Sequence, residues 1–343
     1  MANPRNEAQA YYKKMDSACP NIAKYGRNLN LLYLNGQLDP CYHRDIQLTQ
    51  IQKILLRKNK ANILLTGPAG CGKTALAEGL AAILAERRVV YAAACARAKK
   101  AHKAAIAKWE ADYPDEYAPD SEEYHPQPEY IEPLKPPLCD CVIYDFSLNA
   151  LISGTRYRGE FEERLQEVVN ECRTNRNIIL FCDEIHHIAT VGKTEGSVSM
   201  GQILKPALAR NEIRLIGATT TEEKKEIFAD KALARRFSEV EVLPLEGAAA
   251  EDTAQHILQN YCRFHQVLTD VSAEALLTQV QCCLSHFVFP DNLINVVDET
   301  LAGAAFDGLH VVNMNHFQAT LSRMTGEAVF FEEELHDDAF PAA

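Results

Sequence analysis

Short apolar runs alternate with amphipathic stretches through the first 245 residues of the chain. The runs at 62–65, 142–145, 178–182 and 213–218 are bounded by polar or glycine-containing segments, as is typical of buried strands. Helical periodicity lies between them. This order predicts an α/β fold, with a mostly parallel sheet layered between helices.

Two of the helices in this region have clear apolar faces. One precedes the first strand, with Ile46, Ile51, Ile54 and Leu55 as its apolar positions. The other has one face formed by Phe161, Leu165, Val168, Val169 and Cys172.

Beyond about Leu245 helical periodicity replaces the strands. Helices are expected at 251–264, 273–286, 291–305 and near 315–324, with a short strand at 310–312. The sequence therefore predicts a large α/β domain over 21–245 and a small, mainly helical lid domain over 246–327. A flexible arm over 1–20 and an acidic disordered tail over 328–343 are expected at the ends.

An irregular insertion is expected at about 92–140, inside the large domain. Residues 92–108 are rich in alanine and lysine without an acidic residue, which predicts an exposed basic helix, whereas 110–140 carries many prolines and acidic residues. A solvated loop is the simplest interpretation. A segment that docks a partner is the alternative, and attraction between the two oppositely charged halves is a third.

Composition narrows the functional classes. The chain has 343 residues, 47% of them hydrophobic, and a net charge of −12, which argues against a domain that binds nucleic acid mainly through its phosphates. The 11 cysteines show no Cys-x-x-Cys spacing and fit a reducing compartment. Neither a signal peptide nor a membrane-spanning segment is apparent, so a cytoplasmic protein without a membrane partner is expected.

The strongest candidate site follows the first apolar run. Its sequence matches the phosphate-binding loop pattern of glycine, four residues and then Gly-Lys-Thr, and consists of Gly67, Pro68, Ala69, Gly70, Cys71, Gly72, Lys73 and Thr74. Glycines let the backbone N–H groups surround a phosphate, and the following helix adds its positive end. Lys73 can reach the β- and γ-phosphates, and the Thr74 hydroxyl can bind Mg²⁺. Bound ATP with Mg²⁺ is therefore expected.

A pair of carboxylates, Asp183 and Glu184, ends the third apolar run. An aspartate at the carboxyl end of a strand can hold the hydrated Mg²⁺, and the neighbouring glutamate can orient or deprotonate the attacking water. His186 and His187 follow, but adjacent helix positions point about 100° apart, which disfavours a joint metal site.

Two further elements complete the candidate site. Thr220 follows the next apolar run and would lie beside the γ-phosphate if that strand neighbours the one ending at Asp183. Arg235 and Arg236 are either a solvated pair or cations that reach a neighbouring subunit's γ-phosphate, and the second interpretation implies an oligomer.

Together these segments resemble the AAA+ ATPases of the Clp unfoldase and disaggregase group, in particular the first of their two ATPase modules. The resemblance covers about Ile22 to Gly326, interrupted by the insertion. It rests on the collinear segments Lys24–Leu29, Gly36–Pro40, Arg156–Arg164, Leu204–Arg210, Gly217–Thr220 and Arg235–Phe237.

The resemblance implies a role for each matching residue. Asp183 and Glu184 correspond to the Walker B pair, Thr220 to sensor 1, and Arg235 and Arg236 to arginine fingers that act on a neighbouring subunit. Tyr157 with Arg158 corresponds to the loop that lines the pore of the ring and grips an unfolded polypeptide. A nucleotide-dependent homo-hexamer that remodels a polypeptide substrate, delivered directly or by an adaptor protein, is implied.

Departures from the family pattern motivate an alternative. Asn292 replaces a charged residue of the lid, Ser199–Gln202 departs from the second pore loop, and only one module is recognisable. A nucleotide-switched scaffold or regulatory subunit of a larger Clp-type or other machine is therefore the competing function. A nucleic-acid motor is a third hypothesis, disfavoured by the acidic charge and supported only by the basic helix at 92–108.

Overall fold

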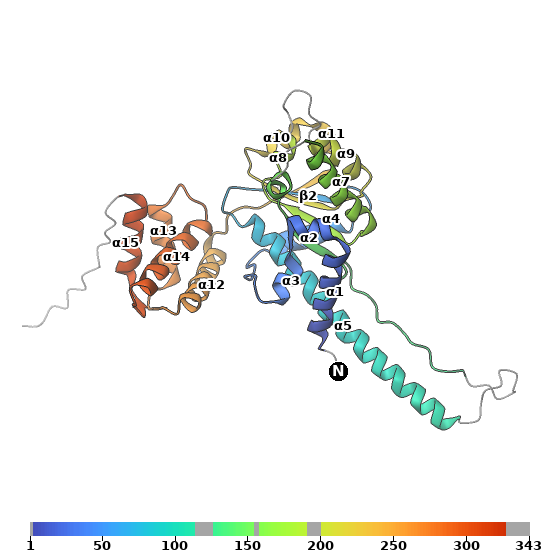
Figure 1. The fold of residues 1–343 in the computed structure, drawn as a ribbon. Helices are drawn as coiled ribbons and strands as arrows, with labels where there is room; N and C mark the ends of the chain where they lie inside the picture. The colour runs from blue at the N-terminus through green and yellow to red at the C-terminus, as the bar shows by residue number, and fades with distance from the viewer. Residues whose placement is uncertain (1–2, 114–125, 154–157, 191–199, 327–343) are drawn as a thin grey trace, which may run out of the picture. The chain divides into compact units, whose positions relative to one another are not determined.

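The computed structural model describes residues 3–113, 126–153, 158–190 and 200–326. The chain divides into two compact units, one of residues 1–66 with 73–241, the other of 67–72 with 242–343 (Figure 1). The first holds a six-stranded sheet and the second a group of helices, as predicted.

The sheet of the first unit has the strand order β1-β3-β4-β5-β2-β6. Its strands are β1 (Gly26–Asn28), β2 (Asn62–Thr66), β3 (Val142–Phe146), β4 (Ile178–Cys182), β5 (Leu215–Thr219) and β6 (Phe237–Glu241). All neighbours pair in parallel except β1, which runs antiparallel to β3. Every residue of β2, β4 and β5 is buried, which explains their uninterrupted apolar sequences. The predicted parallel sheet is confirmed.

Helices surround this sheet and connect its strands. They are α1 (Pro4–Ala18), α2 (Pro20–Tyr25), α3 (Leu29–Leu34), α4 (Asp45–Leu55), α5 (Lys73–Asp112), α6 (Leu148–Ile152), α7 (Arg158–Thr174), α8 (His187–Thr190), α9 (Met200–Ala209), α10 (Lys224–Ala229) and α11 (Lys231–Ala234). In α4 the prediction for Ile46 is wrong, since its side chain is 80% exposed while Ile51 and Ile54 are buried. A spacing of five residues turns a helix by about 500°, so Ile46 lies on a different face from Ile51.

The prediction of a flexible arm over residues 1–20 is wrong for residues 4–18, which form α1. The Asn3 side chain accepts a hydrogen bond from the Arg5 N–H at 3.0 Å and caps the helix. Ala8 and Tyr12, one turn apart, are fully buried, and the Arg5 guanidinium donates to the Leu34 carbonyl. This apolar stripe is narrow among polar residues, so periodicity alone did not reveal it.

The insertion begins as a continuation of α5, not as irregular chain. The helix continues without a break to Asp112 and extends beyond the sheet as an arm (Figure 1). The basic side chains on this arm are exposed, as predicted, namely those of Arg97, Lys99, Lys100, Lys103 and Lys108. Residues 126–136 are irregular, as expected, and return along the helix, where the Tyr130 ring lies 5.7 Å from that of His102. Residues 114–125 lie outside the described residues.

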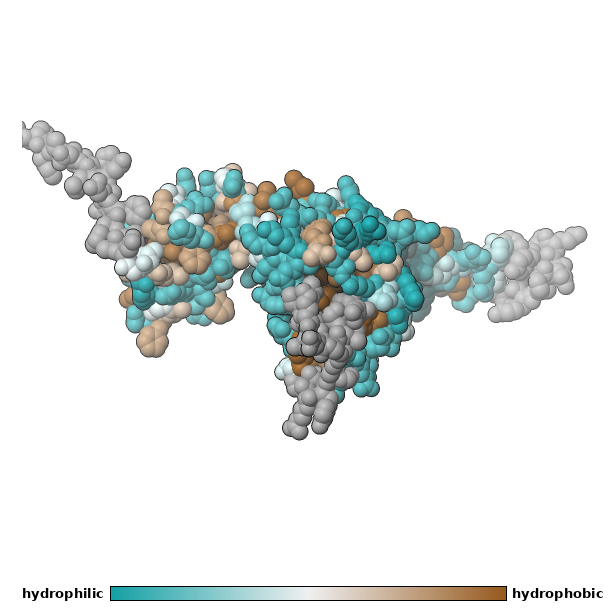
Figure 2. Space-filling view, turned by 90° about the horizontal axis from the view of Figure 1, so that it is seen from above, coloured by the Kyte–Doolittle hydropathy of each residue, from teal (hydrophilic) through white to brown (hydrophobic). Residues whose placement is uncertain are grey.

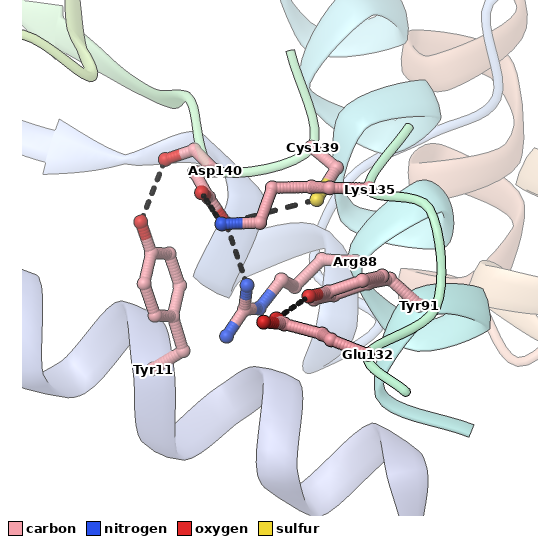
Figure 3. A network of polar contacts seen from close by, with 7 residues as sticks. All are labelled: Tyr11, Arg88, Tyr91, Glu132, Lys135, Cys139 and Asp140. Carbon is pink, nitrogen blue, oxygen red and sulfur yellow. Dashed lines mark hydrogen bonds and ion pairs between the residues drawn. The ribbon is translucent and has the colours of Figure 1, made fainter. Parts of the chain in front are cut away.

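A polar network anchors the returning segment to α1 and α5 (Figure 3). The Asp140 carboxylate accepts from Arg88 at 2.6 Å and from Lys135 at 2.8 Å, and its carbonyl oxygen accepts from the Tyr11 hydroxyl at 2.7 Å. The hydrogen bond to Asp140 raises the pKa of Lys135. The Arg88 guanidinium also lies 4.0 Å from the centre of the Tyr11 ring. Attraction between oppositely charged residues therefore contributes to the base of the arm.

The helical unit consists of α12 (Gly247–His265), α13 (Ala273–Cys283), α14 (Asp291–Phe306) and α15 (Met314–Thr325), with β7 (Leu268–Thr269) paired in parallel to β8 (Val311–Val312). The four helices and the strand near 310–312 match the prediction. Its core includes Leu276, Val296, Leu301, Phe317 and Leu321, all fully buried. The acidic tail lies outside the described residues.

On the face shown in Figure 2 hydrophilic residues predominate and apolar ones are scattered among them. Among the described helices, none has the length and hydropathy that crossing a bilayer requires.

Candidate functional site

The candidate phosphate-binding loop joins β2 to α5. Two of its residues adopt positive φ, Gly70 at 78° and Gly72 at 92°, a conformation that side chains with a Cβ rarely tolerate. Gly67 has a different requirement, since a Cβ there would lie 2.1 Å from the Val242 carbonyl oxygen. The glycines at these three positions are therefore required by the loop geometry.

Lys73 and Thr74 begin α5 directly after this loop. The Lys73 side chain is 9% exposed, although lysine is rarely buried. The Thr74 hydroxyl donates to an Asp183 carboxylate oxygen at 3.0 Å, and therefore joins the start of α5 to the end of β4. The positive end of a 40-residue helix favours an anion at this point.

A tight turn follows β4 and presents both carboxylates to solvent. Glu184 has φ of 49°, which is strained for a residue with a side chain, and its N–H donates to the Asp183 carboxylate at 2.9 Å. The next N–H, that of Ile185, donates to the Ala218 carbonyl of β5 at 3.0 Å. The turn is thus fixed to the neighbouring strand while Asp183 and Glu184 stay exposed.

Thr220 does lie at the end of the strand beside β4, because β4 and β5 pair in parallel. Its hydroxyl donates to the Glu223 carboxylate at 2.8 Å, and the Glu223 N–H donates back to that hydroxyl at 3.2 Å. The hydrogen bond from Thr220 lowers the pKa of Glu223. Glu223 was not among the predicted residues, although the Thr-x-x-Glu pattern of a capping box indicates its contact with Thr220.

His186 connects this second turn to the first. Its side chain is buried, and Nδ1 lies 3.3 Å from the Thr219 hydroxyl and 3.2 Å from the Glu223 carboxylate. The His187 ring lies 4.3 Å from that of His186 and its Nε2 lies 3.6 Å from Glu184. Within the described residues no group of three or more potential metal ligands includes these histidines.

Arg235 and Arg236 follow α11, and both are exposed. Asp230 caps this helix by accepting from the Ala232 N–H at 3.0 Å, and it also pairs with Lys205 of α9. The hydrogen bond from Lys205 lowers the pKa of Asp230. Among the contacts of the described residues, none joins either arginine to Thr74 or Asp183, so the arginines and the phosphate loop remain separate elements within one chain.

Some of the predicted residues cannot be placed. Tyr157 and Ser199 lie outside the described residues, and Arg158 is placed only as the first residue of α7. Asn292 is 3% exposed at the start of α14, where its side-chain oxygen accepts from the Leu293 N–H at 2.8 Å. Its side-chain nitrogen donates to the Phe287 carbonyl at 3.4 Å, so hydrogen bonds on both sides hold the Asn292 amide.

The oxygen atoms of Thr74 and Asp183 suit a magnesium ion. A hydroxyl and a carboxylate are ligands that Mg²⁺ accepts, and their separation of 3.0 Å would let both contact one ion or its water shell. The neighbouring Lys73 and the glycine loop suit the phosphates of a nucleotide. This group of residues fits a magnesium–nucleotide complex.

Known proteins resemble this chain in sequence and in fold. Chaperone protein ClpB 1 of Thermosynechococcus vestitus is 37% identical over 287 residues, 82% of this chain and 27% of that protein. The S. cerevisiae Hsp104–ADP complex matches with 28% identity and a TM-score of 0.66, covering 90% of this chain and 46% of that one. The S. cerevisiae Hsp104–casein complex in its extended conformation matches with 27% identity and a TM-score of 0.67, covering 89% and 45%.

The chain spans 24% to 31% of the length of the curated ClpB and ClpC relatives. Its residues 63–245 match the family described as ATPases associated with various cellular activities (AAA). That match takes in more than half of the 343 residues. The chain therefore belongs to the AAA family, and the predicted resemblance to the Clp group is confirmed.

Proposed function

We propose that this protein hydrolyses ATP at the site formed by Lys73, Thr74, Asp183 and Glu184. The observation that carries the proposal is the 3.0 Å contact between the Thr74 hydroxyl and the Asp183 carboxylate, two oxygen groups of the kind that Mg²⁺ accepts, at the start of the helix that follows the phosphate loop. The loop and Lys73 would hold the phosphates, and Thr74 and Asp183 would hold Mg²⁺, which when bound would supply neutralisation of charge on the β- and γ-phosphates. Glu184, exposed on its strained turn, orients and deprotonates the attacking water.

Thr220 senses the γ-phosphate from the neighbouring strand, and Arg235 and Arg236 act on the nucleotide of an adjacent subunit. Exposure of both arginines, without an ion pair to any described residue, supports a role at an interface. A cation that docks from a second subunit stabilises the charge of the transferring phosphoryl group. The assembly we propose is a nucleotide-dependent homo-hexameric ring.

The work done with ATP is remodelling of a polypeptide. Its support is the kinship with ClpB chaperones and the structural similarity to Hsp104, which was solved in complex with casein. Tyr157 and Arg158 grip the polypeptide in the pore, and substrate arrives directly or through an adaptor protein. A cytoplasmic location, with neither membrane nor nucleic acid as partner, accompanies this proposal.

Turnover measurements test the ATPase. Purified protein is expected to release phosphate from Mg·ATP, and Lys73→Ala or Glu184→Gln to lower kcat at least about a hundredfold by removing phosphate contacts or the base. Lys99→Ala, on the exposed arm, is the matched control and is expected to leave kcat unchanged. Undiminished turnover in either site variant would contradict the assignment. Nucleotide binding without turnover in the wild type would support the scaffold alternative.

Tyr157→Ala tests the remodelling step separately. The substrate is a fluorescent protein fused to an unstructured tail, and its unfolding is measured as loss of fluorescence. The variant is expected to leave basal ATP hydrolysis intact and to stop this unfolding. Unfolding at the wild-type rate by this variant would argue against threading past Tyr157.

A further inference from the structure

A second pocket, of about 310 Å³, lies at the edge of the sheet opposite to Asp183 and Thr220. Its walls come from the link between α4 and β2, from the turn between α7 and β4, and from the residues before β5. Because these parallel strands all begin there, the pocket is at their amino ends, whereas the phosphate loop follows the carboxyl end of β2. The residues that the argument uses are Arg57, Lys58, Arg176, Asn211, Glu212 and Arg214.

This pocket is strongly basic in an acidic protein. Three arginines and one lysine line it, and among the ion pairs of the described residues none involves Arg57, Lys58, Arg176 or Arg214. Glu212, the one carboxylate of the lining, is already shared by Arg173 at 2.8 Å and Arg210 at 3.7 Å, both outside the lining. Positive charges gathered in one pocket repel one another, and an anion bound between them offsets this electrostatic repulsion.

Neutral acceptors hold two of these cations in place. One terminal nitrogen of Arg57 donates to the hydroxyl of Ser238, which is buried, at 3.2 Å. One terminal nitrogen of Arg176 donates to the Asn211 carbonyl at 3.2 Å. A guanidinium has five N–H donors, so each of these contacts fixes the side chain and leaves donors for a ligand.

Asn211 also joins two walls of the pocket. It has φ of 51°, and its side-chain nitrogen donates to the Lys58 carbonyl at 2.8 Å. The chain before β2 is thus tied to the chain before β5, and the spacing of Arg57 and Arg214 does not depend on a bound ligand. Buried Ile178 and Ile213 form the apolar part of the lining.

We propose that this basic pocket binds a small anion bearing two phosphoryl groups, of the size of pyrophosphate. Arginine matches phosphate oxygens with two parallel N–H donors, whereas a single carboxylate would satisfy only one side of a four-cation pocket. The volume lies at the low end for ligand sites, which suits a small anion. The site is separate from the phosphate loop and does not depend on the proposed ATPase.

Isothermal titration of inorganic pyrophosphate into the full chain, at about 0.15 M salt, tests this proposal. Two samples exclude binding of pyrophosphate at the phosphate loop: the wild-type protein with excess ADP and no Mg²⁺, in which ADP occupies the loop, and the Lys73→Ala variant. We expect saturable binding of pyrophosphate to one site in each sample. Arg57→Gln with Arg176→Gln is expected to weaken it at least about tenfold, because charge-assisted hydrogen bonds are lost.

Controls separate a specific site from general attraction. Lys99→Gln with Lys100→Gln removes the same charge from the exposed arm and is expected to change the affinity less than about twofold. Lys58 has an exposed side chain, so Lys58→Gln is expected to weaken binding with an unchanged melting temperature, which excludes unfolding as the cause. Citrate is expected to bind more weakly than pyrophosphate.

Three results would overturn the proposal. One is the absence of saturable binding, and another is equal weakening by the arm variant, which would indicate non-specific attraction. The third is binding that disappears in Lys73→Ala and survives the pocket substitutions, which would place pyrophosphate in the phosphate loop. Citrate that binds as tightly as pyrophosphate would contradict the assignment to phosphoryl groups.

Discussion

Gly217 is the residue whose substitution best tests how the sheet positions Glu184. It lies in β5 between β2 and β4, opposite Leu64 on one side and Cys182 on the other. A Cβ at this position would lie 2.2 Å from Cδ1 of Ile185 and 2.9 Å from its Cβ. Ile185 follows Glu184 directly and is buried, so it cannot turn into solvent to make room.

The magnitude follows from this overlap. A contact of 2.2 Å is more than 1 Å shorter than the optimal separation of carbon atoms, about 3.5–4.0 Å, and overpacking of this kind costs about 1–3 kcal/mol. In a unit of this size the melting temperature should fall by about 2–12 °C. Displacing the turn by about 1 Å would also misplace Glu184, and misplacement on that scale lowers kcat by about a hundredfold.

The assay compares melting temperature and steady-state ATP turnover for Gly217→Ala and Gly303→Ala. Gly303 lies within α14 with open space where its Cβ would be, so alanine there should stabilise the helix by about 0.5–1 kcal/mol and leave kcat unchanged. Ile185→Val removes the Cδ1 atom and should restore part of the loss when combined with Gly217→Ala. A Gly217→Ala protein with the melting temperature and kcat of the wild type would refute the reasoning.

Three further predictions concern stability and reactivity. The Asp16 carboxylate accepts hydrogen bonds from the Tyr144 hydroxyl at 2.7 Å and the Asn28 amide at 2.8 Å, and Asp16→Ala leaves both donors without their acceptor. The free energy of unfolding, measured in urea, should fall by about 2–4 kcal/mol, and an unchanged value would show that these bonds do not stabilise the fold. The hydrogen bond from Lys205 lowers the pKa of Asp230, so the charged carboxylate stabilises the folded protein and Asp230→Asn removes that stabilisation. The free energy lost in this variant should be constant above about pH 5 and should shrink as the pH falls below about 4, where the wild-type carboxylate is protonated; a loss that grows on acidification would contradict this sign. Iodoacetamide at pH 7.5 should modify exposed Cys282 quickly and buried Cys182 only after unfolding, because burial raises the pKa of the Cys182 thiol. Mass spectrometry of peptides measures the order of modification, and modification of Cys182 before Cys282 would contradict this prediction.

The sheet could be predicted from the sequence because burial on both faces forces whole strands to be apolar. The same rule gave no information about α1, where two buried positions, Ala8 and Tyr12, are surrounded by polar residues. The continuous α5 was missed for a different reason. Among the described residues, the contact of its outer part is with the returning segment, where His102 meets Tyr130. Its sequence has no broad apolar face, and the prolines at 114–137 dominated the pattern.

The candidate site divides in the same way. Lys73 and Thr74 could be predicted as site residues because the phosphate-binding loop pattern has a fixed spacing, and Asp183 could be predicted because it ends an apolar run. His186 and Glu223 were not assigned to the site, since their contact joins turns that are far apart in sequence and only the pairing of β4 with β5 brings them together. The basic pocket has no sequence signal either. Its cations come from three separate segments of the chain, so neither a local motif nor the net charge of −12 indicates that they lie together.

The pairing of β4 with β5 has a mechanical consequence for the proposed reaction. The Ile185 N–H donates to the Ala218 carbonyl of β5, which fixes the turn that carries Glu184 to that strand. His186 contacts the Thr219 hydroxyl and the carboxylate of Glu223, and Glu223 in turn accepts from the Thr220 hydroxyl. A γ-phosphate that draws the Thr220 hydroxyl away from Glu223 would therefore act on a group connected to the Glu184 turn. If Thr220 and Glu184 have the roles proposed above, β5 would couple detection of the γ-phosphate to the position of the general base, and Gly217→Ala would disturb that coupling because its Cβ would lie 2.2 Å from Cδ1 of Ile185.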